Sequence, residues 1–196
     1  MTSTDTRPKH AANWSDTEIL RGITDHIFGF DLNPLAVLTA RVNYLIAISD
    51  LLATHSAVEI PIYHADAVYA PTISTSAPTP NPMRIYQIGT RIKAIDLELP
   101  EALIQKNRLF ARVIEIMERT IQHGDTEDAF LALLNAEREY SSEPERDSWE
   151  PSLIDMFQKV AELERRNWNR VWCRLVRNYF ASVAVGKCQV IAGNPP

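Results

Sequence analysis

The sequence predicts an α/β fold, and three observations lead to this prediction. Two short apolar runs, at 26–31 and 58–66, each end on an acidic residue and are predicted to be strands. A long apolar stretch between them, Leu35 to Leu52, is predicted to be a helix. A third, β-branched run, Val190 to Ala192, leads into Gly-Asn-Pro-Pro and is predicted to be a buried strand. Strand, helix and strand in this order are typical of a parallel sheet.

The composition is that of a globular protein and excludes several classes. The chain has 196 residues, 45% of them hydrophobic, which is enough for a sizeable core. Its two cysteines, Cys173 and Cys188, and its five scattered histidines show no zinc-ligand spacing, so we expect no metal site. No uninterrupted apolar run of membrane-spanning length and no signal peptide are present, so we expect a cytoplasmic protein with no membrane partner. The net charge of −5 argues against tight DNA binding by this chain alone.

The first predicted strand ends on Asp31. It is preceded by a helix over 14–21, in which Ser15 and Glu18 have the spacing of a capping box. Leu32 and Asn-Pro follow Asp31 and open the next helix. An acidic residue at the carboxyl end of such a strand can accept hydrogen bonds from both ribose hydroxyls of a nucleotide. The alternative is that Asp31 is only a residue near a helix start, where the helix dipole favours a negative charge.

The second predicted strand ends on Asp66, which is followed by Ala67. Carboxyl ends of parallel strands meet at one edge of a sheet, so we expect Asp66 to lie at the same edge as Asp31. The alternative is that Asp66 is a simple turn former.

The third apolar run ends in Asn194, Pro195 and Pro196. Both prolines fix φ and lack an N–H, so the carbonyls of Asn194 and Pro195 can serve as acceptors beside the Asn194 amide. Such a turn can accept hydrogen bonds from an exocyclic amine. Taken alone, the tripeptide also fits a proline-rich tail.

Together and in this order, the three segments resemble S-adenosylmethionine-dependent DNA methyltransferases of the adenine-N6 class. The most specific part is Phe-Asp-Leu-Asn-Pro-Leu-Ala-Val at 30–37, which is similar to the family's ribose-binding segment. The resemblance implies a partial Rossmann-like sheet, the cofactor S-adenosyl-L-methionine and a role in restriction-modification or phage defence. The implied cofactor-binding residues are Asp31 and Leu32 at the ribose, and Asp66 and Ala67 at the adenine. The implied catalytic residues, which hold the amine of a flipped adenine, are Asn194, Pro195 and Pro196.

Two features of the family are missing from the sequence. No two of the six glycines stand in the Gly-x-Gly arrangement of the cofactor turn, and no aromatic residue follows Pro196. We therefore expect an internal fragment of a larger methyltransferase, inactive by itself, whose partners are DNA, through the parent protein, and the missing flanking segments. Two alternatives stay open: a non-catalytic remnant of a split gene, and a fragment of another α/β nucleotide-binding enzyme such as a dinucleotide oxidoreductase.

A long insertion is predicted between the second and third strands. It opens with a Pro/Ser/Thr-rich loop, which we expect to be mobile. Alternating apolar residues at 84–89 and 91–99, separated by Gly89-Thr90, predict a hairpin. Helices are predicted from Glu101 to His123, ended by Gly124, from Thr126 to Tyr140, and as one long helix from Pro151 to Val185.

The last of these helices is rich in arginine and aromatic residues. They could form a phosphate-contacting surface with stacking platforms for bases. The spacing of three and four favours the alternative, in which the helix contributes core residues: Trp168, Trp172, Leu175 and Tyr179.

The predicted organisation has four parts. They are a disordered start at 1–13, a cofactor-binding part at 14–68, the hairpin and helical insertion at 69–187, and the catalytic strand and turn at 188–196.

Overall fold

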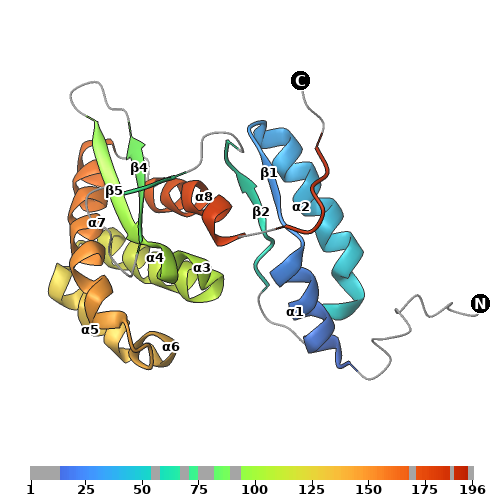
Figure 1. Ribbon diagram of the computed structural model, residues 1–196, viewed down its shortest axis with the longest axis horizontal. Coiled ribbons are helices and arrows are strands. Elements are labelled where there is room, and N and C mark those ends of the chain that lie inside the picture. Colours follow the sequence, from blue (N-terminus) through green and yellow to red (C-terminus); the bar gives the residue numbers. More distant parts are fainter. Residues whose placement is uncertain are drawn as a thin grey trace, which may run out of the picture. The chain divides into compact units, whose positions relative to one another are not determined.

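The structure is a computed structural model that describes residues 14–53, 58–66, 71–74, 82–88, 94–167, 171–185 and 188–193. The predicted α/β class is confirmed: helices accompany one two-stranded sheet and one three-stranded sheet (Figure 1). The chain divides into two compact units, Met1–Ala65 and Asp66–Pro196.

The first unit begins with α1, Asp16–His26, and its capping box is confirmed. The Ser15 hydroxyl accepts a hydrogen bond from Glu18 N at 3.3 Å, and Ser15 N donates to Glu18 Oε2 at 2.8 Å. The hydrogen bonds from Ser15 lower the pKa of the Glu18 carboxyl, because they favour its charged form. This end of the helix is therefore fixed by local sequence alone.

Two strands, β1 (Gly29–Asp31) and β2 (Ile62–His64), form a parallel sheet. Gly29 lies opposite Ile62, and a Cβ atom on Gly29 would come within 2.8 Å of Ile62 Cδ1. Next along the pair, the rings of Phe30 and Tyr63 stack with centroids 5.6 Å apart. Asp31 then lies opposite His64, so both residues stand at the carboxyl end of the sheet.

The crossover between these strands is α2, Pro34–Ile48, followed by the short 3₁₀ helix η2, Ser49–Leu51. Asn33 caps α2 through its side-chain oxygen, which accepts from Leu35 N at 2.9 Å. Val37 and Ile48 are buried, and the Tyr44 hydroxyl donates to the Ile23 carbonyl at 3.2 Å. One face of α2 therefore packs within this unit.

The opposite face of α2 is an exposed apolar stripe, formed by residues that are 41 to 68% exposed: Leu35, Leu38, Val42, Leu45 and Ile46. Their spacing of three and four places them on one side of the helix. Among the described residues, Pro34–Leu51 is also the one helical stretch long and apolar enough to cross a membrane by length and composition alone. A core helix of a soluble protein meets the same criterion.

The second unit contains the antiparallel sheet β3 (Thr72–Ile73), β4 (Met83–Ile88) and β5 (Ile95–Pro100), in that order. The predicted hairpin is confirmed as the pair β4 and β5. Its second strand begins later than predicted, because Ile88 pairs with Ile95 and six residues lie between them. The predicted Gly89-Thr90 turn lies outside the described residues.

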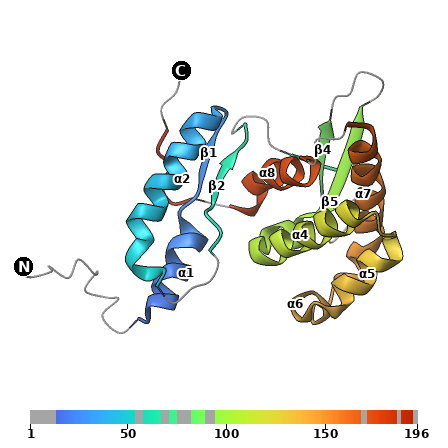
Figure 2. The same cartoon turned by 180° about the vertical axis from the view of Figure 1, so that it is seen from behind.

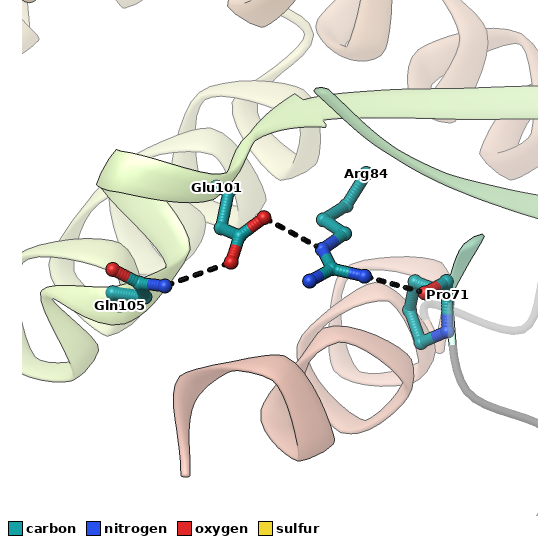
Figure 3. A network of polar contacts seen from close by, with 4 residues as sticks. All are labelled: Pro71, Arg84, Glu101 and Gln105. Atoms are coloured by element: carbon teal, nitrogen blue, oxygen red, sulfur yellow. Dashed lines mark hydrogen bonds and ion pairs between the residues drawn. The ribbon is translucent and has the colours of Figure 1, made fainter. Parts of the chain in front are cut away.

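A polar network joins this sheet to the helix that follows it (Figure 3). Arg84 Nε on β4 donates to Glu101 Oε2 at 2.9 Å, and Arg84 Nη1 reaches the Pro71 carbonyl at 3.5 Å. The other carboxylate oxygen of Glu101 accepts from Gln105 Nε2 at 2.8 Å. Arg84 and Glu101 are both largely buried, so this ion pair is only weakly screened by water.

In the described part of the chain, six helices follow: α3 (Glu101–Gln105), α4 (Asn107–His123), α5 (Glu127–Ala136), α6 (Arg138–Ser141), α7 (Arg146–Asn167) and α8 (Trp172–Ala184). Gly124 ends α4 in the left-handed conformation, with φ of 75°, as predicted. The predicted helices 101–123 and 126–140 are each divided in two. The breaks fall at Lys106 and Glu137, whose ψ angles of 67° and 115° are not helical.

The prediction of one long helix from Pro151 to Val185 is wrong. α7 starts earlier, at Arg146, and ends at Asn167. α8 starts at Trp172, whose backbone N–H donates to Glu164 Oε1 at 3.0 Å. Because α7 and α8 also contact each other, both can cover the same core, which a single straight helix could not do.

The core of the second unit is a single cluster in which helices cover the hairpin. α7 contacts β5, and the two lie side by side in both views (Figures 1 and 2). α8 packs on α3 and α4, and Tyr179 of α8 stacks on Tyr86 of β4 at 3.9 Å. The largest fully buried side chains of the core cluster include Phe110, Phe130, Tyr140, Trp149 and Phe180. The partly buried Trp172 packs against this cluster, in agreement with the core interpretation of this segment.

The predicted strand at Val190–Ala192 is not formed. Residues 188–193 contain no strand, and Val190 and Ile191 are 84% and 86% exposed. A short apolar run becomes a strand only where a sheet edge supplies hydrogen bonds and neighbours cover its faces. The parallel sheet described here has two strands, and a partial Rossmann-like sheet remains a proposal.

Candidate functional site

The candidate site is the turn between β1 and α2, built around Asp31. Asp31 is the last residue of β1 and is exposed. Its Oδ1 accepts a hydrogen bond from Asn33 N at 2.7 Å, which closes the turn, and Asn33 in turn caps α2. Pro34 occupies the first turn of the helix, where its missing N–H costs nothing. The sequence Asp-Leu-Asn-Pro thus determines this turn locally.

Contacts from β2 hold the same turn from the other side. The His64 Nε2 atom lies 2.8 Å from the Leu32 carbonyl, and Ala65 N donates to the Asp31 carbonyl at 3.2 Å. A ring nitrogen that contacts a carbonyl must carry the proton, so this geometry requires the tautomer or charge state with hydrogen on Nε2. The backbone of residues 31–32 is therefore held by both strands.

Arg41 fixes the helix against the sheet. Its Nε donates to the Ile62 carbonyl at 2.9 Å, so a charged group on α2 reaches the strand that follows it. Because Ile62 also lies opposite Gly29 of β1 in the sheet, this hydrogen bond holds α2, β1 and β2 in one arrangement.

The chemistry available at this turn is hydrogen-bond acceptance by a carboxylate. Among the described residues, Asp31 Oδ1 is engaged by Asn33 N, and no partner contacts Oδ2. An exposed carboxylate oxygen can accept a hydrogen bond from a neutral hydroxyl, such as a hydroxyl of a ribose. No group of three or more acidic, histidine or cysteine side chains in the described ranges could hold a metal ion.

Three of the predicted site residues lie among the described residues. Asp31 and Leu32 lie at the carboxyl end of β1, and Leu32 is 64% exposed. Asp66 is half-buried and follows β2 by two residues, as the first residue of the second unit. The other predicted site residues lie outside the described residues: Ala67, Asn194, Pro195 and Pro196.

Sequence reasoning missed His64 and Arg41 as parts of this site. His64 stands two residues before Asp66 at the end of a predicted strand, and this position was the available signal. Arg41 carried no comparable signal, because its contact with Ile62 depends on the crossing of α2 over the sheet.

Comparison of the chain with protein family models, with curated proteins and with solved structures gives no match.

Proposed function

We propose that the turn at Asp31 is the ribose-binding segment of an S-adenosylmethionine-dependent DNA methyltransferase that modifies adenine N6. The observation that carries the proposal is the position of Asp31 at the carboxyl end of a parallel strand, directly before a capped helix, with Oδ2 not engaged by a described residue. Ligands of open parallel sheets bind at this end of the strands. In the proposal Leu32 contacts the ribose with Asp31, and Asp66 and Ala67 contact the cofactor's adenine.

The rest of the proposal rests on the sequence resemblance. Asn194, Pro195 and Pro196 accept hydrogen bonds from the amine of a flipped adenine, and DNA and the remaining segments of the enzyme are the partners. The cofactor is S-adenosyl-L-methionine and the setting is restriction-modification or phage defence in the cytoplasm. The run at 30–37 favours this class over a dinucleotide oxidoreductase.

Two features of the first unit support the proposal that its two strands are part of a larger Rossmann-like sheet. A parallel sheet of two strands is small, since parallel sheets are ordinarily covered on both faces and extended by further strands. In addition, α2 presents apolar side chains on the face that points away from its own strands. A helix that is apolar all round is typical of the interior of a larger protein.

Ligand-detected NMR on the full chain tests the ribose assignment. Adenosine and 2′,3′-dideoxyadenosine differ only in the two ribose hydroxyls from which Asp31 would accept hydrogen bonds. We expect adenosine to bind roughly tenfold more tightly, the scale of a charge-assisted hydrogen bond. Asp31→Asn should remove most of this preference, and Asp50→Asn, which changes another exposed carboxylate of the same unit, should leave it intact.

Competition then separates the two nucleotide-binding classes. S-adenosylhomocysteine should displace adenosine at lower concentrations than NAD does. The reverse order would favour the oxidoreductase alternative. Equal binding of adenosine and dideoxyadenosine would leave Asp31 as a turn residue and remove the basis of the proposal.

A further inference from the structure

The second unit contains a cavity with a volume of about 460 Å³. Residues near the end of α4, the second half of α7 and the first turn of α8 line it. Its volume falls in the range of small-molecule sites, which are commonly formed between packed helices. The cavity belongs entirely to the second unit and takes no part in the turn at Asp31.

The cavity has an apolar interior and acidic walls. Ile121, Phe157 and Cys173 supply the apolar surface, and Phe157 and Cys173 are almost fully buried. Among the described residues, the charged groups of the lining are three acids and one base: Glu118, Asp125, Glu164 and Arg165. An apolar surface with a few charged groups is the usual composition of a site that binds a charged organic molecule.

The charges of the lining do not cancel. Arg165 pairs with Glu162, an acid outside the lining that also pairs with Arg166. Glu118 accepts a hydrogen bond from Gln122 Nε2 at 3.2 Å and lies 3.7 Å from the Nε atom of Arg174, an arginine that is 75% exposed. Glu164 accepts from the backbone N–H of Trp172, which carries no net charge. Among the described residues, the lining therefore carries more acidic than basic side chains.

We propose that this cavity binds a small organic cation, an alkyl- or arylammonium whose charged end lies between Glu118 and Glu164 and whose apolar body contacts Phe157 and Ile121. This site is independent of the proposed methyltransferase function. An ammonium group has three donors and suits two carboxylates, while the apolar interior excludes ions that keep a full hydration shell.

Cys173 provides a reporter inside the cavity. Its thiol has no partner among the described residues, and the other cysteine, Cys188, is exposed. Burial, followed by the nearby charges of Glu118 and Glu164, raises the pKa of the Cys173 thiol, so it reacts slowly and remains a neutral group of the lining. A bound ligand should slow its reaction with a small alkylating reagent further.

The experiment uses the full chain carrying Cys188→Ser, and three probes with the same apolar body: phenethylammonium, 2-phenylethanol and 3-phenylpropionate. Alkylation of Cys173 by iodoacetamide is followed by mass spectrometry, and binding is measured independently from methyl NMR shifts of Ile121. We expect phenethylammonium to bind with a dissociation constant on the order of 1 mM, at least about fivefold more tightly than the alcohol, and the carboxylate to bind weakest.

Variants then test the two carboxylates. The double substitution Glu118→Gln and Glu164→Gln should reduce the preference for ammonium over alcohol roughly fivefold. Glu115→Gln, an exposed acid on the same helix outside the cavity, should leave the preference unchanged. The ratio of the two affinities is read within each variant, so a partial loss of folding does not affect it. Equal binding of all three probes, no binding of any probe, or an unchanged preference in the double variant would overturn the proposal.

Discussion

Asp31 has two separable roles. One carboxylate oxygen closes the turn through Asn33 N, and the other is the acceptor that we assign to ribose. Asparagine keeps an oxygen for the first role but loses the charge needed for the second, while alanine loses both. Comparing the two substitutions therefore distinguishes a ligand contact from a turn residue.

Asp31→Asn should leave the free energy of unfolding nearly unchanged, whereas Asp31→Ala should lower it by about 1 kcal/mol, the value of a lost local side-chain to backbone hydrogen bond. Both should weaken cofactor binding by about 1.5 to 3 kcal/mol. Denaturant unfolding of the chain measures the first effect, and calorimetry on an enzyme rebuilt with its flanking sequence measures the second. Unchanged cofactor affinity in both variants would contradict the ribose contact.

Tyr140 predicts a pH dependence of stability. Burial, followed by the charge of Glu150, raises the pKa of its phenol to about 12. Below about pH 10 the phenol is neutral in both the folded and unfolded states, and it has no effect. Between pH 10 and about 12 only the unfolded state ionises, so the free energy of unfolding should fall by about 2 to 3 kcal/mol in total.

Tyr140→Phe should remove the part of the stability loss at alkaline pH that comes from the Tyr140 phenol. The part that comes from other groups should remain. At neutral pH the variant should be at least as stable as the natural chain, because the buried hydroxyl has no partner among the described residues. Urea unfolding at pH 7, 9.5 and 11 measures both effects. An identical decrease in the free energy of unfolding of the two proteins above pH 10 would show that folding does not raise the pKa of the Tyr140 phenol.

At the scale of elements, two glycines provide a matched pair. Gly124 ends α4 with φ of 75°, where an L side chain is strained although space is open around it. Gly22 lies inside α1, and a Cβ atom there would make an ordinary 4.0 Å contact with Trp14. We expect Gly124→Ala to destabilise the second unit by about 1 kcal/mol and Gly22→Ala to stabilise the first by about 0.5 to 1 kcal/mol. Thermal unfolding followed by circular dichroism checks the opposite signs.

The ion pair between Arg84 and Glu101 joins the sheet to α3 (Figure 3). We expect a coupling free energy of about 1 to 2 kcal/mol in a double-mutant cycle with Arg84→Met and Glu101→Gln, more than for an exposed pair. The exposed pair of Arg146 and Asp147, treated in the same way, should give no more than about 0.5 kcal/mol. Equal coupling for both pairs would mean that burial does not strengthen the first one.

Elements set by local chemistry could be predicted from the sequence, and those set by packing could not. The capping box at Ser15, the hairpin pairing and the stop at Gly124 depend on neighbouring residues and are confirmed. The breaks at Lys106 and Glu137, and the division of the last helix, have no strong local signal. They allow short helices to cover one core from several directions. For the same reason Asp31 could be predicted as a candidate site residue, whereas Arg41, which acts across elements, could not.

At the scale of the whole molecule, the two units have very different cores. Among described residues, six hydrophobic side chains are buried in the first unit, whereas the core cluster of the second has 23 members. Since buried apolar area is the main source of stability, the second unit should be the more stable one.

Native-state hydrogen exchange should show this difference directly. Amides of α2 and β1 should exchange at least about 100-fold faster than those of α4 and α7, with no common slowest rate. The same measurement with a saturating nucleotide should slow exchange in the first unit alone. A single cooperative exchange rate for all four elements would show that the two units unfold together.

The exposed stripe on α2 also determines how this protein can be studied. Environment-sensitive dyes such as anilinonaphthalene sulfonate fluoresce when they meet accessible apolar surface, and they ordinarily find it only after tertiary packing is lost. Here Leu35, Leu38 and Ile46 offer that surface in the folded chain. Melting curves followed by dye fluorescence should therefore begin at a high and constant signal, which hides the unfolding transition. In a Trp14→Phe variant all remaining tryptophans, among them the fully buried Trp149, belong to the second unit, and their emission follows that unit without the dye.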